Sequence, residues 1–140
     1  MKLNHFTDFS LRILIFLFHK EEGNSTSLDE LAEKLSISRN HIVKVVQFLS
    51  HQELITTKRG KNGGISISEK GKDIQLGKLT NLLEQDDNPV INCSTKPCIF
   101  QSHRCKLKSF LDVAYKAFLD SLNQHKLSDL AFNNWNEIFK

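Results

Sequence analysis

The stretch that decides the fold runs from residue 27 to residue 68 and reads "SLDELAEKLSISRNHIVKVVQFLSHQELITTKRGKNGGISIS". Ser27 and Glu30 have capping-box spacing, and the apolar residues that follow recur at helical spacing, so the pattern predicts a short helix. The segment 36–38 breaks this pattern, and Ser38 is placed to cap a second helix. That helix is predicted from the helical spacing of Ile42, Val45, Val46 and Leu49.

A hairpin follows the second helix. Two short β-branched runs, 54–57 and 65–68, flank the tip "RGKNGG" at 59–64. The Asn-Gly and Gly-Gly pairs supply the positive φ that a tight hairpin turn requires. A helix, a short helix, a three-residue turn, a helix and a basic hairpin form the order of a winged helix-turn-helix, so we expect a mainly α fold of this class.

The flanking segments are predicted to be helical. A buried helix is expected over about 8–20, with Thr7 and Asp8 as its N-cap residues, and another over 73–85. Residues 106–124 carry the strongest helical pattern of the chain, and one more short helix is expected after Ser128. The long helix is either the seam of a homodimer or an ordinary core helix, since periodicity does not distinguish the two.

These elements divide the chain into four segments. Residues 1–75 are predicted to form the winged helix-turn-helix DNA-binding domain, and residues 76–105 a linker helix followed by a cysteine loop. Residues 106–124 are the candidate dimerisation helix, and residues 125–140 form the C-terminal tail.

Charge supports a nucleic-acid partner. Residues 34–72 hold eight lysines and arginines and two glutamates, a net charge of +6, whereas the whole chain carries only +3. Polar side chains at the start of the second helix are placed to reach base edges in the major groove of double-stranded DNA, and cations on the hairpin to reach phosphate or the minor groove. The candidate DNA-binding residues are Ser38, Arg39, Asn40, His41, Lys44, Lys58, Arg59 and Lys61. A module of this size is expected to bind a palindromic operator as a dimer.

The cysteines predict metal chemistry. No apolar run approaches the roughly 20 residues that cross a bilayer, and the N-terminus lacks signal-peptide features, so a cytoplasmic protein without membrane contact and with reduced thiols is expected. All three cysteines lie in "NCSTKPCIFQSHRC", residues 92–105. Zinc bound by three thiolates and His103 and an iron–sulfur cluster fit this spacing about equally. A disulfide with a spare thiol, or a catalytic thiol near His103, fits less well, and no catalytic residue is identified.

Four stretches carry a resemblance that covers nearly the whole chain. They are "LNHFTDFSLRILIFL" at 3–17, "SRNHIVKVVQFLS" at 38–50, "RGKNGGI" at 59–65 and "NCSTKPCIFQSHRCKLKSFL" at 92–111. Together they resemble the family of winged-helix iron–sulfur regulators, and within it the repressors that sense nitric oxide. The resemblance implies a homodimer joined by the long helix and a transcriptional repressor that releases its operator when nitric oxide attacks its cluster. It does not imply an enzyme.

The resemblance also implies a ligand set. It assigns Cys93, Cys98 and Cys105 to a [4Fe-4S] cluster, with Asp8 of the partner subunit as the fourth ligand. A [2Fe-2S] cluster and zinc are the alternative cofactors, and a related regulator that senses iron–sulfur supply or redox state is the alternative function. One departure is the gap of six residues between Cys98 and Cys105, where the family pattern has about five. Lengthening a loop by one residue costs little closure entropy, so ligation remains compatible with this spacing.

Overall fold

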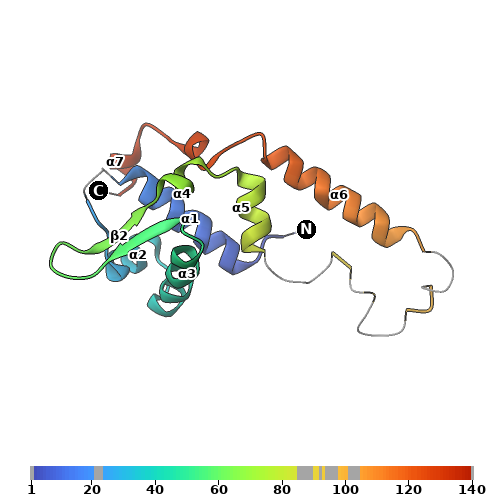
Figure 1. Ribbon diagram of the computed structural model, residues 1–140, viewed down its shortest axis with the longest axis horizontal. Helices are drawn as coiled ribbons and strands as arrows, with labels where there is room; N and C mark the ends of the chain where they lie inside the picture. Colours follow the sequence, from blue (N-terminus) through green and yellow to red (C-terminus); the bar gives the residue numbers. More distant parts are fainter. Residues whose placement is uncertain are drawn as a thin grey trace.

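The computed structural model describes residues 2–20, 24–84, 90–91, 93, 98–100 and 105–139. Within these ranges the chain forms seven α-helices, one 3-10 helix and a two-stranded antiparallel sheet. The helices between residues 5 and 83 make a compact body. The two-stranded hairpin extends from one end of it, and the helix of residues 107–122 extends from the other (Figure 1). The winged helix-turn-helix fold predicted from the sequence is confirmed.

Helix α1, His5–His19, passes through this body and buries one broad face. Its N-cap is Asn4, whose side-chain oxygen accepts a hydrogen bond from the backbone N–H of Thr7 at 2.8 Å. The predicted N-cap at Thr7 or Asp8 is therefore wrong, because asparagine caps as well as they do and stands one turn earlier. Thr7 is fully buried, and Asp8 lies on the outer side of the first turn.

The helix-turn-helix is formed by α2, Leu28–Leu35, and α3, Arg39–His51. Ser27 caps α2 by accepting from the N–H of Glu30 at 3.0 Å, as predicted. Ser36 ends α2 with a φ of 53°, a left-handed conformation that turns the chain between the two helices. Ser38 then begins α3, which buries the predicted row of Ile42, Val45, Val46 and Leu49.

The wing consists of β1, Ile55–Lys58, and β2, Gly64–Ile67, paired from Ile55 opposite Ile67 to Lys58 opposite Gly64. Positive φ occurs at Gly64 (147°), which belongs to the predicted Gly-Gly pair, and at Gly60 (103°), which was not predicted, but not at Gly63 of the Asn-Gly pair. Gly63 is required for another reason: a Cβ there would lie 2.2 Å from the carbonyl oxygen of Lys58.

The helix predicted over 73–85 begins later than expected, as α5, Leu76–Leu83, and a short helix that was not predicted, α4, Glu69–Asp73, precedes it. Ile74 and Gln75 are extended because the returning chain pairs with them. The N–H of Leu127 donates to Ile74 at 3.0 Å, and the N–H of Leu76 donates to His125 at 2.8 Å. Such long-range backbone pairing is invisible to a local helical pattern.

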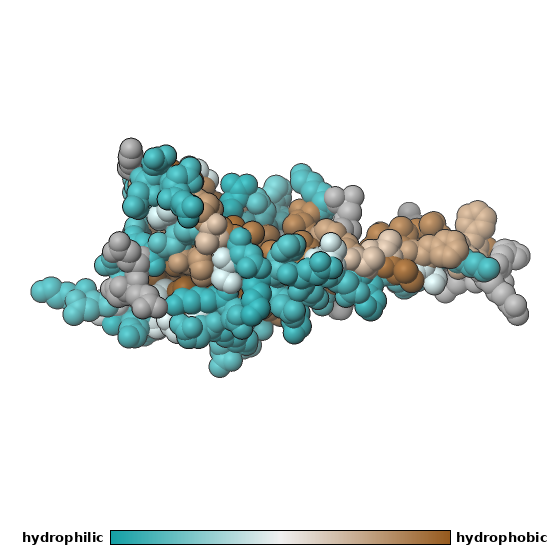
Figure 2. All heavy atoms as spheres, turned by 90° about the horizontal axis from the view of Figure 1, so that it is seen from above, coloured by the Kyte–Doolittle hydropathy of each residue, from teal (hydrophilic) through white to brown (hydrophobic). Residues whose placement is uncertain are grey.

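Helix α6, Leu107–Leu122, has no buried residue, although it carries the strongest helical pattern of the chain. Its C-terminal end packs on α5, where Leu122 is half-buried against the core. The rest extends beyond the body, and a row of apolar side chains along it is visible from above (Figure 2). In the described part of the chain no helix is both long enough and apolar enough to cross a bilayer.

The tail returns to α1 through a 3-10 helix, Leu127–Leu130, and a short helix α7, Trp135–Ile138. Trp135 stacks on His19 with ring centroids 4.5 Å apart, and the N–H of Phe132 donates to the Nε2 of His19 at 3.1 Å. One core joins the body, and its members come from α1, α2, α3, the wing, α5 and Leu127.

Candidate DNA interface and cysteine loop

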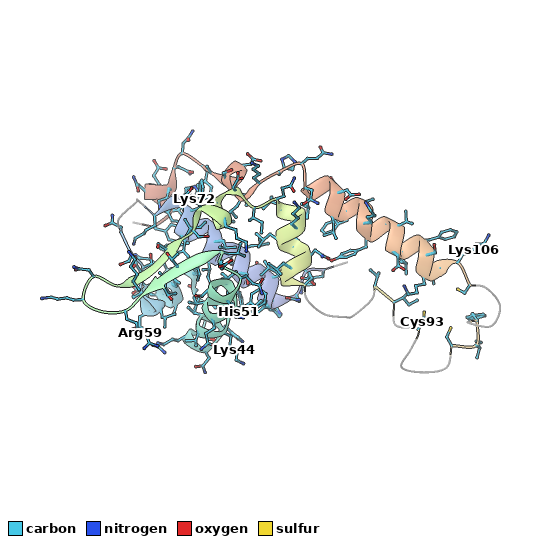
Figure 3. All side chains as sticks on the ribbon, viewed as in Figure 1. Lys44, His51, Arg59, Lys72, Cys93 and Lys106 are labelled. Carbon is cyan, nitrogen blue, oxygen red and sulfur yellow. The ribbon has the colours of Figure 1, made fainter. Side chains whose placement is uncertain are left out.

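The recognition surface begins on the face of α3 that points away from the core. Because Ile42, Val45, Val46 and Leu49 are buried, helical geometry turns Asn40, Lys44, Gln47 and His51 to the opposite side, and all four are exposed. Figure 3 shows Lys44 and His51 on this helix. The predicted residues Asn40 and Lys44 are therefore available to DNA.

Three of the predicted DNA-binding residues, Ser38, Arg39 and His41, have side-chain partners within the chain. The Nε of Arg39 donates to the carboxylate of Asp29 at 2.8 Å, in an ion pair whose side chains are 59% and 79% exposed. Pairs this exposed contribute roughly 0–1 kcal/mol, so Arg39 can exchange its partner for a phosphate at low cost. His41 is held more closely, since its Nδ1 lies 2.8 Å from the hydroxyl of Ser38 and its ring lies against Phe9.

The wing brings further cations beside α3. Lys58, Arg59 and Lys61 are all exposed, and Arg59 directly follows β1 (Figure 3). Their ammonium and guanidinium groups suit phosphate contacts, which position a protein on the duplex without reading its sequence. The two glycines of positive φ lie on either side of Lys61 and let the backbone turn sharply there.

Gln47 and His51 were not among the predicted DNA-binding residues, but both line two neighbouring grooves. A groove of about 750 Å³ between α1, α3 and α5 is lined by Phe6, Lys44, Phe48 and both residues, among others. A second groove of about 370 Å³ toward the wing is also lined by both, together with Thr57. The helical period that identified Lys44 also identifies them, because they continue the same exposed face.

The cysteine loop lies apart from this surface. Cys93, Cys98 and Cys105 are free thiols, the first two half-buried and the third exposed. Figure 3 places Cys93 beneath helix α6, away from the body. The pKa of Lys108 near the start of α6 is raised, chiefly by its hydrogen bond to Asp112 and that carboxylate's charge, with a minor contribution from Cys93.

Asp8 lies on the body. Its carboxylate accepts from the Nε of Arg12 at 2.9 Å, and this hydrogen bond and the charge of Asp8 raise the pKa of Arg12. Among the residues that the structure describes, no three histidines, cysteines, aspartates or glutamates lie close enough to hold a metal ion. His103, the ligand of the zinc alternative, lies outside the described residues. The described part of one chain therefore does not bring Asp8 to its own thiols.

The donor set nevertheless fits an iron–sulfur cluster. Three unpaired thiols supply soft ligands from one loop, and Asp8 is 42% exposed in a pair that it can exchange. The helix α6 carries an exposed apolar side. Phe110 and Val113 are 64% and 67% exposed, and Leu107 is 49% exposed on the same side of the helix.

The comparisons with known proteins agree with this architecture. Residues 3–133 match the family model of Rrf2, described as an iron-dependent transcriptional regulator. The crystal structure of the oxidized form of CymR from Staphylococcus aureus is 26% identical, with a TM-score of 0.70 over 95% of this chain and 98% of that one.

Two further structures share the fold. CymR (YrzC), the global cysteine regulator of B. subtilis, is 23% identical with a TM-score of 0.65, over 94% of this chain and 99% of that one. IscR of T. potens is 17% identical with a TM-score of 0.69, over 93% and 85% of the two chains. Rrf2 proteins are transcriptional regulators, not enzymes; they bind DNA and are often dimeric. Because the family model matches nearly its whole length, the chain belongs to the Rrf2 family of transcriptional regulators.

Proposed function

We propose that this protein is a dimeric repressor of the NsrR type, which senses nitric oxide through a [4Fe-4S] cluster. The ligands are Cys93, Cys98 and Cys105 of one subunit and Asp8 of the other. The observation that carries the proposal is the separation of these groups in a single chain. The three thiols are free and Cys93 lies beneath α6, away from the body, whereas the carboxylate of Asp8, which would complete the set, is 42% exposed on the body.

The dimer would present two DNA-binding heads, each formed by α3 and the wing of one subunit, to a palindromic operator. In each head Ser38, Arg39, Asn40, His41 and Lys44 lie at the start of α3, the end that enters the major groove. Lys58, Arg59 and Lys61 on the wing would contact phosphates or the minor groove. The spacing of two half-sites fixes the spacing of the two heads, so a change in how the subunits are held changes operator affinity.

Asp8 is the residue at which sensing would begin. When bound, the cluster supplies iron that reacts with nitric oxide. The carboxylate of Asp8 is a hard donor and would hold iron less firmly than three soft thiolates. Without iron, Asp8 pairs with Arg12, one turn away, and α1 of one subunit would then no longer be tied to the cysteines of the other. The loaded dimer therefore binds the operator and represses, and the damaged one releases it.

The test uses full-length protein purified without oxygen. It should be brown, contain about four irons per chain, and bind operator DNA until nitric oxide is added. Asp8→Ala should make the cluster less stable or change its reaction with nitric oxide, with little effect on thermal unfolding. Asp120→Ala is the matched control, because Asp120 also pairs with a cation at i,i+4 spacing, here with Lys116 at 2.6 Å. An Asp8 variant that reacts like the wild type refutes ligation by the partner.

A second candidate function has its own observation in support. The exposed thiol of Cys105 and two half-buried ones are open to oxidation, and CymR of Staphylococcus aureus has been crystallised in an oxidized form. The same fold could then report redox state or iron–sulfur supply, through a [2Fe-2S] cluster, zinc or the thiols alone. Metal and sulfide analysis separates these: one zinc per chain, or colourless protein whose DNA affinity changes with oxidant, would replace the nitric oxide proposal.

A further inference from the structure

The residue after Asp8 contacts the recognition helix. The ring of Phe9 lies against the imidazole of His41, with centroids 5.3 Å apart and planes tilted by 42°. His5, one turn earlier on α1, also stacks on Phe9, with ring centroids 6.0 Å apart. Phe9 thus contacts both the start of α1 and the first turn of α3, and it follows the candidate ligand directly in the chain.

His41 is fixed from its other side by the residue that begins α3. The hydroxyl of Ser38 lies 2.8 Å from the Nδ1 of His41 and 3.5 Å from its backbone N–H. The ring is therefore the closer of the two partners of the cap hydroxyl. A shift of His41 would move the hydroxyl that caps α3, and with it the turn that carries Arg39 and Asn40.

A second aromatic contact keeps the two helices together further along. Phe6 packs edge-on against Phe48 with centroids 5.3 Å apart, in the second half of α3. Phe48 is half-buried and packs against the core, so this contact holds α1 to α3, whereas the Phe9 contact ends on His41, an exposed residue at the start of the helix. A displacement of the first turn of α1 is therefore passed to the start of α3 through Phe9.

We infer that Phe9 is a positioning residue that couples the state of Asp8 to the recognition helix, with His41 and the Ser38 cap as the receiving end. The inference rests on the proposed function, because it needs Asp8 to alternate between the partner's cluster and Arg12. It gives His41, which was predicted as a DNA-binding residue, a second role inside the protein. Phe9 does not contact DNA itself; it determines the position of the first turn of α3.

The experiment compares operator affinity before and after nitric oxide in wild type, Phe9→Leu, Phe9→Tyr and Phe18→Leu. Leucine keeps an apolar side chain but removes the ring, whereas tyrosine restores it. Phe18 is the control because it is half-buried on the same helix and its ring packs only against His19 among the ring contacts of the described residues. The absorption spectrum of the cluster should be the same in all four proteins.

The measured quantity is the ratio of the two affinities. An aromatic contact of this kind shifts an equilibrium about two- to tenfold, so Phe9→Leu should reduce the ratio by that factor. Phe9→Tyr and Phe18→Leu should keep the wild-type ratio. A purely structural role for Phe9 would weaken both forms equally and leave the ratio unchanged, which would overturn the inference alone. A wild-type protein without a cluster, or one that ignores nitric oxide, overturns the proposed function and this inference with it.

Discussion

At the scale of single residues, Asp8 and Arg12 form an exposed ion pair. The two side chains are 42% and 56% exposed, so the pair contributes little to the free energy of unfolding. A carboxylate held by one exposed guanidinium can therefore be transferred to another cation without disrupting the fold. The hydrogen bond and the charge of Asp8 raise the pKa of Arg12, which favours the charged guanidinium.

The pKa of Tyr115 reports on its partial burial where α6 packs near the end of α5. Partial burial raises the pKa of its phenol above 10.0, and the charge of Glu84 adds to the effect. Because Tyr115 is the only tyrosine of the chain, absorbance near 295 nm reports its ionisation alone after correction for the single tryptophan. We expect a midpoint above that of the unfolded protein, moving down in Glu84→Gln. The folded state binds this proton more tightly, so its contribution to stability is complete below pH 10 and is lost as the pH rises further. A midpoint equal to that of the unfolded chain would contradict the burial of this ring.

At the scale of elements, the joint between α5 and α6 determines how the long helix leaves the body. A Cβ at Gly77 would lie 2.2 Å from the carbonyl oxygen of Leu119 and 2.5 Å from the Oδ1 of Asn123. The same Oδ1 accepts from the N–H of Lys78 at 2.8 Å, so the two helices are joined by a hydrogen bond as well as by close contact.

Gly77→Ala should therefore push α6 away from α5. Overpacking of this kind costs about 1–3 kcal/mol, which thermal or urea unfolding would detect. Because the angle of α6 sets the distance between the two heads of the proposed dimer, operator affinity should fall as well. Asn81→Ala is the control, since Asn81 is exposed on the same helix and its replacement should change neither quantity. Wild-type stability in Gly77→Ala would show that the joint is loose.

The elements also show how far the sequence could be interpreted. Capping serines and helical spacing predicted α2 and α3, and β-branched runs with glycines predicted the wing, because those signals are local. The late start of α5 was missed, since it depends on pairing with Leu127, about fifty residues away. The helical pattern predicted α6 but not how the helix is used: Leu122 packs against the core, while Phe110 remains exposed. Clustering made the three cysteines candidate metal ligands, whereas Asp8 could be proposed only from a family resemblance, because no spacing in one chain predicts a ligand from a second.

At the scale of the whole molecule, two functions are assigned to opposite ends. The DNA-binding head, formed by α3 and the wing, lies at one end, and α6 with Cys93 lies at the other (Figures 1 and 3). Under the proposed function, a signal that begins at the cysteines of one chain would have to enter the head of the second chain, where Asp8 is exposed. The surface that joins the two subunits would then be part of the sensor.

Phe110→Glu tests that surface. Phe110 is 64% exposed in the middle of the apolar side of α6, and burying a charge there without a partner is costly. We expect the dimer to weaken at least tenfold, about 1.4 kcal/mol, as measured by analytical ultracentrifugation. Operator affinity should fall in parallel, because a monomer binds only one of the two half-sites. Lys116→Glu is the matched control, since Lys116 lies outside the apolar side and pairs with Asp120. If Phe110→Glu remained a dimer of wild-type affinity, α6 would not be the seam, and Asp8 would need another route to the partner's thiols.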